Sequence, residues 1–539
     1  MTEYEQIVST ECEDKYIRRT PYEYRKKMGQ FFTPIHVADF MSPWVINNKS
    51  GKTILDPAVG LGIFFRSILK SHPEDAHSYK FIGCDVCDKI IEEAKKLLIG
   101  VNEINIQLMN EDYLISDWDK QYDGIICNPP YLKFHNYGNQ KELLELFSEK
   151  MNTKLSGFTN IYTLFLLKAL KQVKTHGRVA FIVPSEFLNS NYGKKIKRLI
   201  KESGMLRFII IIDFNSMVFD NATTTSCILL FAKDDYNHEV EFINIKDIDE
   251  LNLIHSYMLS YPLMRKKGKV IKIRELDEAQ KWRVYYQELN GSKYKNLVPF
   301  SSFARVSRGI ATGANKYFLF SESKRRKHGI SKDFLLPCLS KAQYARKHFF
   351  GSDDFERLRK ADKPIYLLDA KDMNDTNLRK YIQMGEKQGI DRKYLTSHRT
   401  PWYSLENRPP APILAIVFNR SGLRFVRNEA NVYNLTSFHC VYPRVSLFLK
   451  LELLMAYLIT DVAAEIFDDS RREYGDGLRK FEPNDLNDAL VVDFQKITPD
   501  LETEILALYD QFRSLELKGK DTSEIKNALN DCFLKVFKR

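Results

Sequence analysis

Residues 123–131 read Asp123-Gly124-Ile125-Ile126-Cys127-Asn128-Pro129-Pro130-Tyr131. The apolar run 124–127 is typical of a strand that is buried on both faces of a parallel sheet. Pro129 and Pro130 lack the backbone N–H that a strand ladder requires, so the strand ends before them. The pattern predicts that Asn128 and Tyr131 lie on a rigid loop at the carboxyl end of a strand, where α/β sheets bind ligands.

The side chains of this loop suit a flat ligand that carries an amino group. The side-chain oxygen of Asn128 and the carbonyl oxygen of Pro129 can both accept hydrogen bonds from an exocyclic amine. The ring of Tyr131 can stack on a base. Four residues are a short motif, so the remainder of the chain decides what this loop does.

The composition is that of a globular protein with a basic surface. The 539 residues are 44% hydrophobic and 28% charged, enough for two or more domains. The formal net charge of +11 favours a polyanionic partner. The eight cysteines are scattered, and Cys84-x-x-Cys87 has no second pair at zinc spacing, so we expect neither a disulfide framework nor a bound metal.

We expect a cytoplasmic protein with no membrane association. The N-terminus has no signal-peptide pattern. The apolar run at 449–467 contains four charged residues, which is typical of a core helix rather than a membrane span.

Upstream of residue 123, strands alternate with turns and helices. We predict strands at 53–56, 81–85 and 104–108, and a helix that is capped by Thr33 and begins with Pro34. Asp56 ends the first strand, and the segment Pro57-Ala58-x-Gly60-x-Gly62 forms a turn whose backbone amides can approach a ligand. Asp85 ends the second strand and Asp112 follows the third.

Downstream, the pattern predicts a polar loop at 133–154, a helix at 160–174 closed by Gly177, and strands at 178–184, 208–214 and 226–231. This alternation is typical of an α/β domain with a mainly parallel sheet covered on both faces. The alternation weakens near residue 235. We therefore divide the chain into an N-terminal arm or loose helix (1–20), an α/β domain (21–245) and an α+β domain with C-terminal helices (246–539).

The ordered set of motifs resembles the gamma class of N6-adenine DNA methyltransferases of restriction–modification systems. The motifs are Gln30-Phe31-Phe32-Thr33-Pro34, Asp56-Pro57-Ala58-x-Gly60-x-Gly62, Asp85, Asp112 and Asn128-Pro129-Pro130-Tyr131. In the second domain, 306–315, 401–404 and 477–483 resemble segments of that class's target-recognition domain. The chain departs from the class at Val59 and Leu61, where Cys and a small residue are common.

The resemblance implies a Rossmann-like class I methyltransferase domain that uses S-adenosylmethionine, followed by a domain that binds double-stranded DNA. It implies that Phe31, Thr33 and Pro34 enclose the methionine end of the cofactor. Its amino-acid moiety then lies at Asp56, Pro57, Ala58, Gly60 and Gly62. Asp85 accepts from the ribose, and Asp112, with Glu111 as the alternative, accepts from the cofactor's adenine.

The same resemblance makes the loop 128–131 catalytic, with Asn128, Pro129, Pro130 and Tyr131 around the target amine and no metal. A flipped-out base would stack on Tyr131 and on a second aromatic residue, Phe219, with Phe214 as the alternative. Basic clusters at 25–27, 194–195, 265–267 and 324–327 would contact DNA phosphates.

Other activities also fit parts of the sequence, among them a DNA-binding component of a larger defence system. N4-cytosine methyltransferases share the chemistry, although Ser more often replaces the Asn, and protein-glutamine and RNA methyltransferases share the Asn-Pro-Pro-Tyr motif but do not need so large a second domain. A fused restriction–modification enzyme would need a nuclease site, for which Asp369 and Lys371 are the candidates. A separate cognate restriction endonuclease is the partner that a modification enzyme implies.

Overall fold

The computed structural model describes residues 11–98, 104–132, 134, 137–155, 160–190, 192–212, 225–236, 238–246, 249–263, 267–371, 373–419, 423–444, 449–473 and 479–537. Phe214 and Phe219 lie outside these residues. The chain divides into two compact units between Gln287 and Glu288. This division comes later than the predicted boundary at 245, because β9 (Lys269–Lys272) pairs with β8 (Glu239–Ile245) in the first unit.

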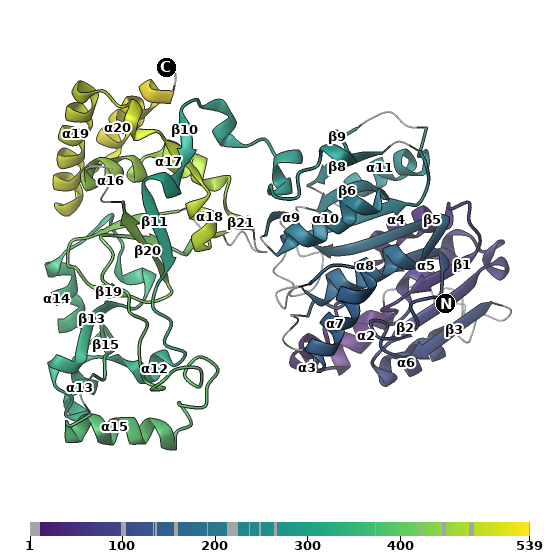
Figure 1. Ribbon diagram of the computed structural model, residues 1–539, viewed down its shortest axis with the longest axis horizontal. Coiled ribbons are helices and arrows are strands. Elements are labelled where there is room, and N and C mark those ends of the chain that lie inside the picture. The colour runs from purple at the N-terminus through teal and green to yellow at the C-terminus, as the bar shows by residue number, and fades with distance from the viewer. Residues whose placement is uncertain are drawn as a thin grey trace. The chain divides into compact units, whose positions relative to one another are not determined.

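A nine-stranded sheet forms the centre of the first unit (Figure 1). Its other strands are β1 (Thr53–Asp56), β2 (Lys80–Asp85), β3 (Asn105–Asn110), β4 (Tyr122–Cys127), β5 (Val173–Pro184), β6 (Leu206–Ile212) and β7 (Ser226–Ala232). Their order is β3-β2-β1-β4-β5-β7-β6-β8-β9. Strands β1 to β5 run parallel to one another, and β7 runs antiparallel between β5 and β6. Because the order reverses between β1 and β4, the carboxyl ends of these two strands define the ligand-binding edge.

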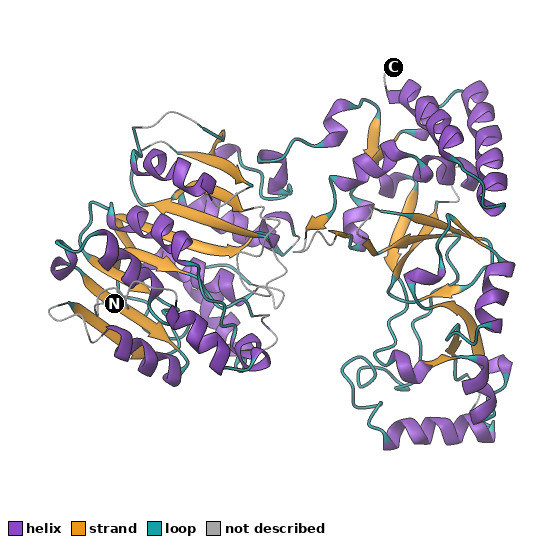
Figure 2. Ribbon diagram, turned by 180° about the vertical axis from the view of Figure 1, so that it is seen from behind, coloured by secondary structure: helices purple, strands orange, loops and turns teal. Residues whose placement is uncertain are grey.

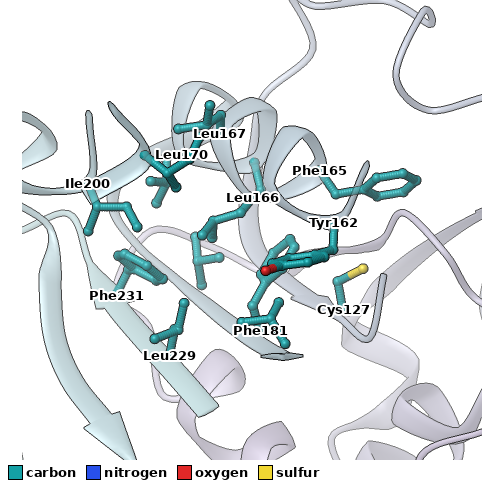
Figure 3. Packing of buried hydrophobic residues seen from close by; sticks show 14 of the residues in the cluster. Cys127, Tyr162, Phe165, Leu166, Leu167, Leu170, Phe181, Ile200, Leu229 and Phe231 are labelled. Atoms are coloured by element: carbon teal, nitrogen blue, oxygen red, sulfur yellow. The ribbon is translucent and has the colours of Figure 1, made fainter. Parts of the chain in front are cut away.

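Helices cover both faces of this sheet (Figure 2). The helices of this unit are α2 (Glu11–Arg19), α3 (Tyr22–Met28), α4 (Ile35–Ile46), α5 (Ile63–Ser71), α6 (Asp88–Leu98), α7 (Gln140–Lys150), α8 (Ile161–Gln172), α9 (Glu186–Asn189), α10 (Gly193–Ser203) and α11 (Asp249–Leu259). Successive strand residues point to opposite faces. Accordingly, Ile126 packs with α4 and α5, whereas Cys127 packs with α8 on the other face (Figure 3). This architecture confirms the predicted α/β, Rossmann-like fold.

Three local predictions differ from the structure, whereas the helix expected as one option for the N-terminal segment is present as α2. Part of the expected polar loop forms α7 around the buried Leu143 and Phe147. Helix α8 ends at Gln172, and Gly177 lies inside β5, because Val173 already pairs with Tyr122. A Cβ on Gly177 would lie 2.7 Å from the carbonyl oxygen of Asp123, so the glycine allows close strand packing rather than a helix cap.

The second unit mixes sheets and helices. Its strands are β10 (Leu297–Pro299), β11 (Ala304–Arg308), β12 (Leu319–Phe320), β13 (Leu335–Leu339), β14 (Phe349–Phe350), β15 (Tyr366–Leu368), β16 (Ile413–Ile416), β17 (Phe418–Asn419), β18 (Phe425–Asn428), β19 (Tyr433–Asn434), β20 (Phe438–Pro443), β21 (Arg472–Glu473), β22 (Arg479–Lys480) and β23 (Leu490–Val492). Its helices are α12 (Asn315–Phe318), α13 (Glu322–His328), α14 (Ser352–Lys360), α15 (Thr376–Lys387), α16 (Leu451–Ile459), α17 (Asp461–Asp468), α18 (Pro483–Asn487), α19 (Pro499–Leu517) and α20 (Ser523–Phe537).

The helices α16 and α17 replace the single core helix that the apolar run 449–467 predicted. Thr460 separates them, because its side chain accepts a hydrogen bond from the backbone N–H of Ala463 and caps α17. Both helices belong to the largest apolar core of this unit, together with residues of α19 and α20. No helix in the described part of the chain is long and apolar enough to cross a membrane.

Gly124 makes the packing of α4 on β4 possible. A Cβ at this position would come within 2.4 Å of Val45 Cγ1 and 2.6 Å of Ile54 Cδ1. We expect Gly124→Ala to lower the free energy of unfolding by about 1–3 kcal/mol, measured as a shift in the denaturation midpoint of the full chain. Gly138→Ala is the control, because no described atom lies within 4 Å of its Cβ position. Equal midpoints for the two variants would contradict this account.

Candidate active site

A pocket opens at the carboxyl ends of the four parallel strands β1 to β4. Asp56 ends β1, Asp85 ends β2, Asp112 follows β3 and Asn128 follows β4, and all four line the pocket. The predicted residues Phe31, Thr33, Pro57, Ala58, Gly60 and Pro130 also line it. The topology therefore collects the separate motifs of the sequence at one edge of the sheet.

The side chain of Asn128 is held in one orientation. Its Nδ2 donates to the carbonyl oxygen of Phe31 over 2.8 Å and to Thr33 Oγ1 over 3.0 Å. Its Oδ1 is buried and accepts no hydrogen bond from any described residue. Because a buried acceptor without a donor is costly, this oxygen marks a place where a ligand N–H fits.

Thr33 has a different local role from the one that its sequence context indicates. Pro34 occupies the N-cap position of α4, and no side chain caps this end. The hydroxyl group of Thr33 accepts from Asn128 instead. The predicted helix cap is therefore wrong, and the residue connects the segment before α4 to the loop after β4.

The ring of Tyr131 is fixed by its neighbours. Its centroid lies 5.8 Å from that of Phe31 with an interplanar angle of 22°, and the edge of Tyr162 packs against it at 6.3 Å. The hydroxyl group donates to the carbonyl oxygen of Ile182 over 3.3 Å. Tyr131, Pro129, Pro34 and Gly62 are not among the residues that line the pocket.

The turn after β1 places a buried carboxylate at the pocket. Gly60 and Gly62 have φ angles of 51° and 75°, which strain residues with a Cβ. Asp56 is 1% exposed, and its Oδ1 accepts from the backbone N–H of Ala58 over 3.1 Å. No described group donates to its Oδ2, which is also buried. Burial raises the pKa of Asp56 well above its usual value, so its anionic form needs a cationic or N–H partner.

Asp85 organises the same turn from the neighbouring strand. Its Oδ2 accepts from the backbone N–H of Gly60 over 3.2 Å, and its Oδ1 accepts from that of Cys87 over 2.9 Å. Burial raises the pKa of Asp85, although these hydrogen bonds oppose the shift. The carboxylate thus fixes the glycine turn while it lines the pocket.

Asp112 and Glu111 both reach the pocket, so its geometry does not choose between them. Asp112 Oδ1 accepts from the backbone N–H of Leu114 over 2.9 Å, and its Oδ2 accepts from the hydroxyl group of Tyr137 over 2.5 Å. Glu111 Oε1 accepts from the thiol of Cys84 over 3.5 Å.

The pocket also includes residues that no sequence motif indicated. Tyr137, Phe165 and Glu13 come from three helical or loop segments without a recognisable motif. Gln30 is the exception, because it stands directly before Phe31 in the quoted motif. Gln30 Oε1 accepts from Tyr16 over 3.3 Å, whereas its Nε2 is buried and meets no acceptor among the described residues.

Several of the predicted phosphate-binding side chains make intramolecular contacts. Arg25 is only 7% exposed, and Arg325 forms an ion pair with Glu322 over 2.6 Å. Lys324 Nζ donates to three backbone carbonyl groups, and burial lowers its pKa to about 8. These three side chains therefore support the fold. Arg265 and Lys266 lie outside the described residues.

The candidate nuclease residues form a simple surface contact. Asp369 follows β15 and forms an ion pair with Lys371, whose side chain is 74% exposed. Among the described residues, no three His, Cys, Asp or Glu side chains form a group that could hold a metal ion.

Comparison with protein families agrees with this geometry. Residues 14–299 match the family model described as N-6 DNA Methylase, which is more than half of the chain. The chain belongs to the N-6 DNA methylase family. Residues 280–529 match a second model, the C-terminal domain of Type II methyltransferase M.Eco57I. Both matches confirm the predicted class of methyltransferase with a C-terminal recognition domain.

Relatives of this family match the chain over most of its length. Type II methyltransferase M.AccI from Acinetobacter calcoaceticus is 46% identical over 528 residues, which cover 98% of this chain and 96% of the relative. Type II methyltransferase M.XamI from Xanthomonas campestris pv. amaranthicola is 24% identical over 466 residues, which cover 85% of this chain and 84% of the relative.

One solved structure extends the likeness in fold to both units. The Type IIL restriction-modification enzyme MmeI, solved in complex with DNA, superposes with a TM-score of 0.57 at 12% identity. The alignment covers 98% of this chain and 74% of MmeI. At this identity the likeness concerns the fold alone. The family match and the relative M.AccI, not this fold likeness, show that the chain is a DNA methyltransferase of the restriction–modification type and do not favour a fused nuclease.

Proposed function

We propose that this methyltransferase transfers a methyl group from S-adenosylmethionine to N6 of an adenine that is flipped out of duplex DNA. The observation that carries the proposal is the buried Oδ1 of Asn128, which has no donor among the described residues. The opposite end of the amide is held by Phe31 and Thr33, so this oxygen is presented to a substrate amine. The resemblance of the loop 128–131 to adenine methyltransferases supports adenine as the base.

Asn128 and Pro129 would make the target amine nitrogen a better nucleophile. The lone pair of an exocyclic amine is delocalised into the ring, so the nitrogen is a poor nucleophile. Hydrogen bonds from its two N–H groups to Asn128 Oδ1 and to the carbonyl oxygen of Pro129 favour a pyramidal nitrogen with a localised lone pair. In a dry site such bonds strengthen in the transition state and contribute about 3–4 kcal/mol.

The pocket fits the amino-acid end of S-adenosylmethionine, which carries the reactive methyl group on its sulfonium. Asp56 Oδ2 is a buried acceptor that suits the ammonium group, and Gln30 Nε2 is a buried donor that suits the carboxylate. Phe31 and Thr33 line the same pocket, and we assign them, with Pro34, to the methionine end. Asp85 is assigned to the ribose and Asp112 to the adenine of the cofactor.

The target base would stack on Tyr131, whose ring orientation Phe31 and Tyr162 fix. Phe219 remains our proposal for the second aromatic contact, and it lies outside the described residues. Binding of duplex DNA with 2-aminopurine at the target position should raise its fluorescence, because flipping unstacks the probe.

Relatives named as Type II methyltransferases support a modification enzyme that works beside a separate restriction endonuclease. The decisive experiment is mass spectrometry of nucleosides from duplex DNA incubated with the protein and S-adenosylmethionine. We expect N6-methyl-2′-deoxyadenosine. N4-methyl-2′-deoxycytidine would instead establish the cytosine alternative, and an absence of methylated nucleosides would contradict the proposal. Sequencing of the methylated sites would define the recognition sequence.

Thr33→Val should reduce turnover moderately. The substitution keeps the shape of the side chain but removes the oxygen that accepts from Asn128 Nδ2, while the bond to Phe31 remains. Loss of one such hydrogen bond costs about 0.5–1.5 kcal/mol, so we expect a two- to tenfold lower kcat, measured at saturating DNA and cofactor. Turnover equal to that of the wild type would show that Thr33 does not orient Asn128.

A further inference from the structure

Helix α2 covers the cofactor pocket. Cys12 and Tyr16 pack against Leu61 in the glycine turn, and the rings of Tyr16 and Phe32 meet edge to face with centroids 5.4 Å apart. The hydroxyl group of Tyr16 also donates to Gln30 Oε1. This helix therefore contacts both segments to which we assign the amino-acid end of the cofactor, the glycine turn and the residues before α4.

Glu13 is the residue of α2 that reaches into the pocket. It is 5% exposed and lines the pocket together with Asp56 and Gln30. Its Oε1 forms an ion pair with Arg66, whose side chain is fully buried in α5. Its Oε2 is buried as well, and no residue in the described ranges donates to it.

The ion pair with Arg66 uses only Oε1 of Glu13, so anchoring of α2 does not account for the buried Oε2. Leaving a buried carboxylate oxygen without a donor is more costly than leaving a neutral acceptor unpaired, so a ligand donor is expected there. Glu13 and Asp56 line one pocket, and each has a buried carboxylate oxygen to which no described residue donates. Together they suit a cationic N–H donor rather than a hydroxyl group.

We propose that Glu13 binds the α-ammonium group of S-adenosylmethionine through Oε2, so that α2 is part of the cofactor site. This inference rests on the proposed function, because it requires S-adenosylmethionine as the cofactor. Glu13 would share the ammonium with Asp56 Oδ2, while the ion pair with Arg66 holds the Glu13 carboxyl group in place. The N-terminal helix would then select cofactors that retain the amino-acid moiety.

The test compares two ligands by titration calorimetry with the full chain. S-adenosylhomocysteine carries the ammonium group, whereas 5′-deoxy-5′-methylthioadenosine has the same nucleoside without the amino-acid moiety. Glu13→Gln keeps an oxygen for Arg66 and removes the charge. We expect this variant to bind S-adenosylhomocysteine about 10- to 100-fold more weakly and methylthioadenosine as the wild type does, because a hydrogen bond to a charged group is strong.

Asp14→Asn is the matched control, because Asp14 is the exposed neighbour of Glu13 on α2. It should bind both ligands like the wild type. Glu13→Asp is a further variant, which is shorter but keeps the carboxyl group. If both Glu13 variants lose as much affinity for methylthioadenosine as for S-adenosylhomocysteine, Glu13 only holds α2 in place and the inference is overturned. Unchanged binding of both ligands would overturn it too. A wild-type protein that binds neither ligand would refute the proposed function itself.

Discussion

Replacing Asn128 by Ala should reduce methyl transfer by about 10²- to 10³-fold or more, because the variant loses an acceptor aimed at the reacting amine. The cofactor pocket keeps its other lining residues, so S-adenosylhomocysteine should bind with an affinity close to that of the wild type. The measurements are single-turnover methylation of duplex DNA and calorimetric titration of S-adenosylhomocysteine. The loss should appear in the chemical step rather than in cofactor binding.

Asn105→Ala provides the comparison for this variant. Asn105 is exposed at the amino end of β3, away from the strand ends that form the pocket, so its truncation should leave both measurements unchanged. Asn128→Ala methylating DNA at the rate of the wild type would disprove the proposed role of the amide oxygen. A parallel loss of S-adenosylhomocysteine binding would instead mean that the loop 128–131 supports the cofactor site.

The sequence predicted strands β1 to β7 of the central sheet because they are short apolar runs with clear ends, whereas β8 and β9 were not predicted. Asp56 and Pro57 end β1, and the two prolines end β4, as expected from residues that cannot continue a ladder. Since parallel strands carry their functional residues at the carboxyl end, the motifs Asp56, Asp85, Asp112 and Asn128 could be placed at one edge. The structure brings all four to one pocket.

Long-range contacts explain what the sequence did not predict. Helix α7 has mostly polar residues, and only tertiary packing of Leu143 and Phe147 reveals its buried side. Thr33-Pro34 has the pattern of a helix start, but a side chain almost a hundred residues away takes the hydroxyl group. Glu13 carries no motif, because its place at the pocket depends on the packing of α2 against the glycine turn. Contacts between residues that are distant in the sequence cannot be recognised from the residues on either side of them.

Asp56→Asn should nearly abolish cofactor binding while it stabilises the protein without cofactor. The proposed bond between Asp56 Oδ2 and the ammonium group is a buried charge pair, and breaking such a pair costs about 2–5 kcal/mol, or roughly 30-fold to several thousand-fold in affinity. Titration with S-adenosylhomocysteine measures this loss. In the cofactor-free protein, however, the wild-type carboxylate is buried with an oxygen that no described residue pairs, and the neutral amide removes that cost.

The effect on stability should depend on pH in a defined direction. Burial raises the folded-state pKa of Asp56, whereas in the unfolded chain the group titrates near its ordinary value of about 3.9. The folded state then binds more protons, so the cofactor-free wild type loses stability as pH rises from about 4 through the raised pKa. Asp56→Asn lacks this contribution, so its melting temperature should fall less over that range than the wild type's.

Differential scanning fluorimetry at several pH values, with and without S-adenosylhomocysteine, separates these effects. The difference between wild type and Asp56→Asn isolates this carboxylate from Asp85 and Glu13, whose pKa values burial also raises. Asp75→Asn, a substitution of an exposed aspartate in the same unit, should behave like the wild type. Saturating S-adenosylhomocysteine should stabilise the wild type more as the pH rises through the raised pKa of Asp56, because only the anionic carboxylate forms a charge pair with the ammonium group. Equal ligand stabilisation of wild type and Asp56→Asn would place the amino-acid end of the cofactor elsewhere in the pocket.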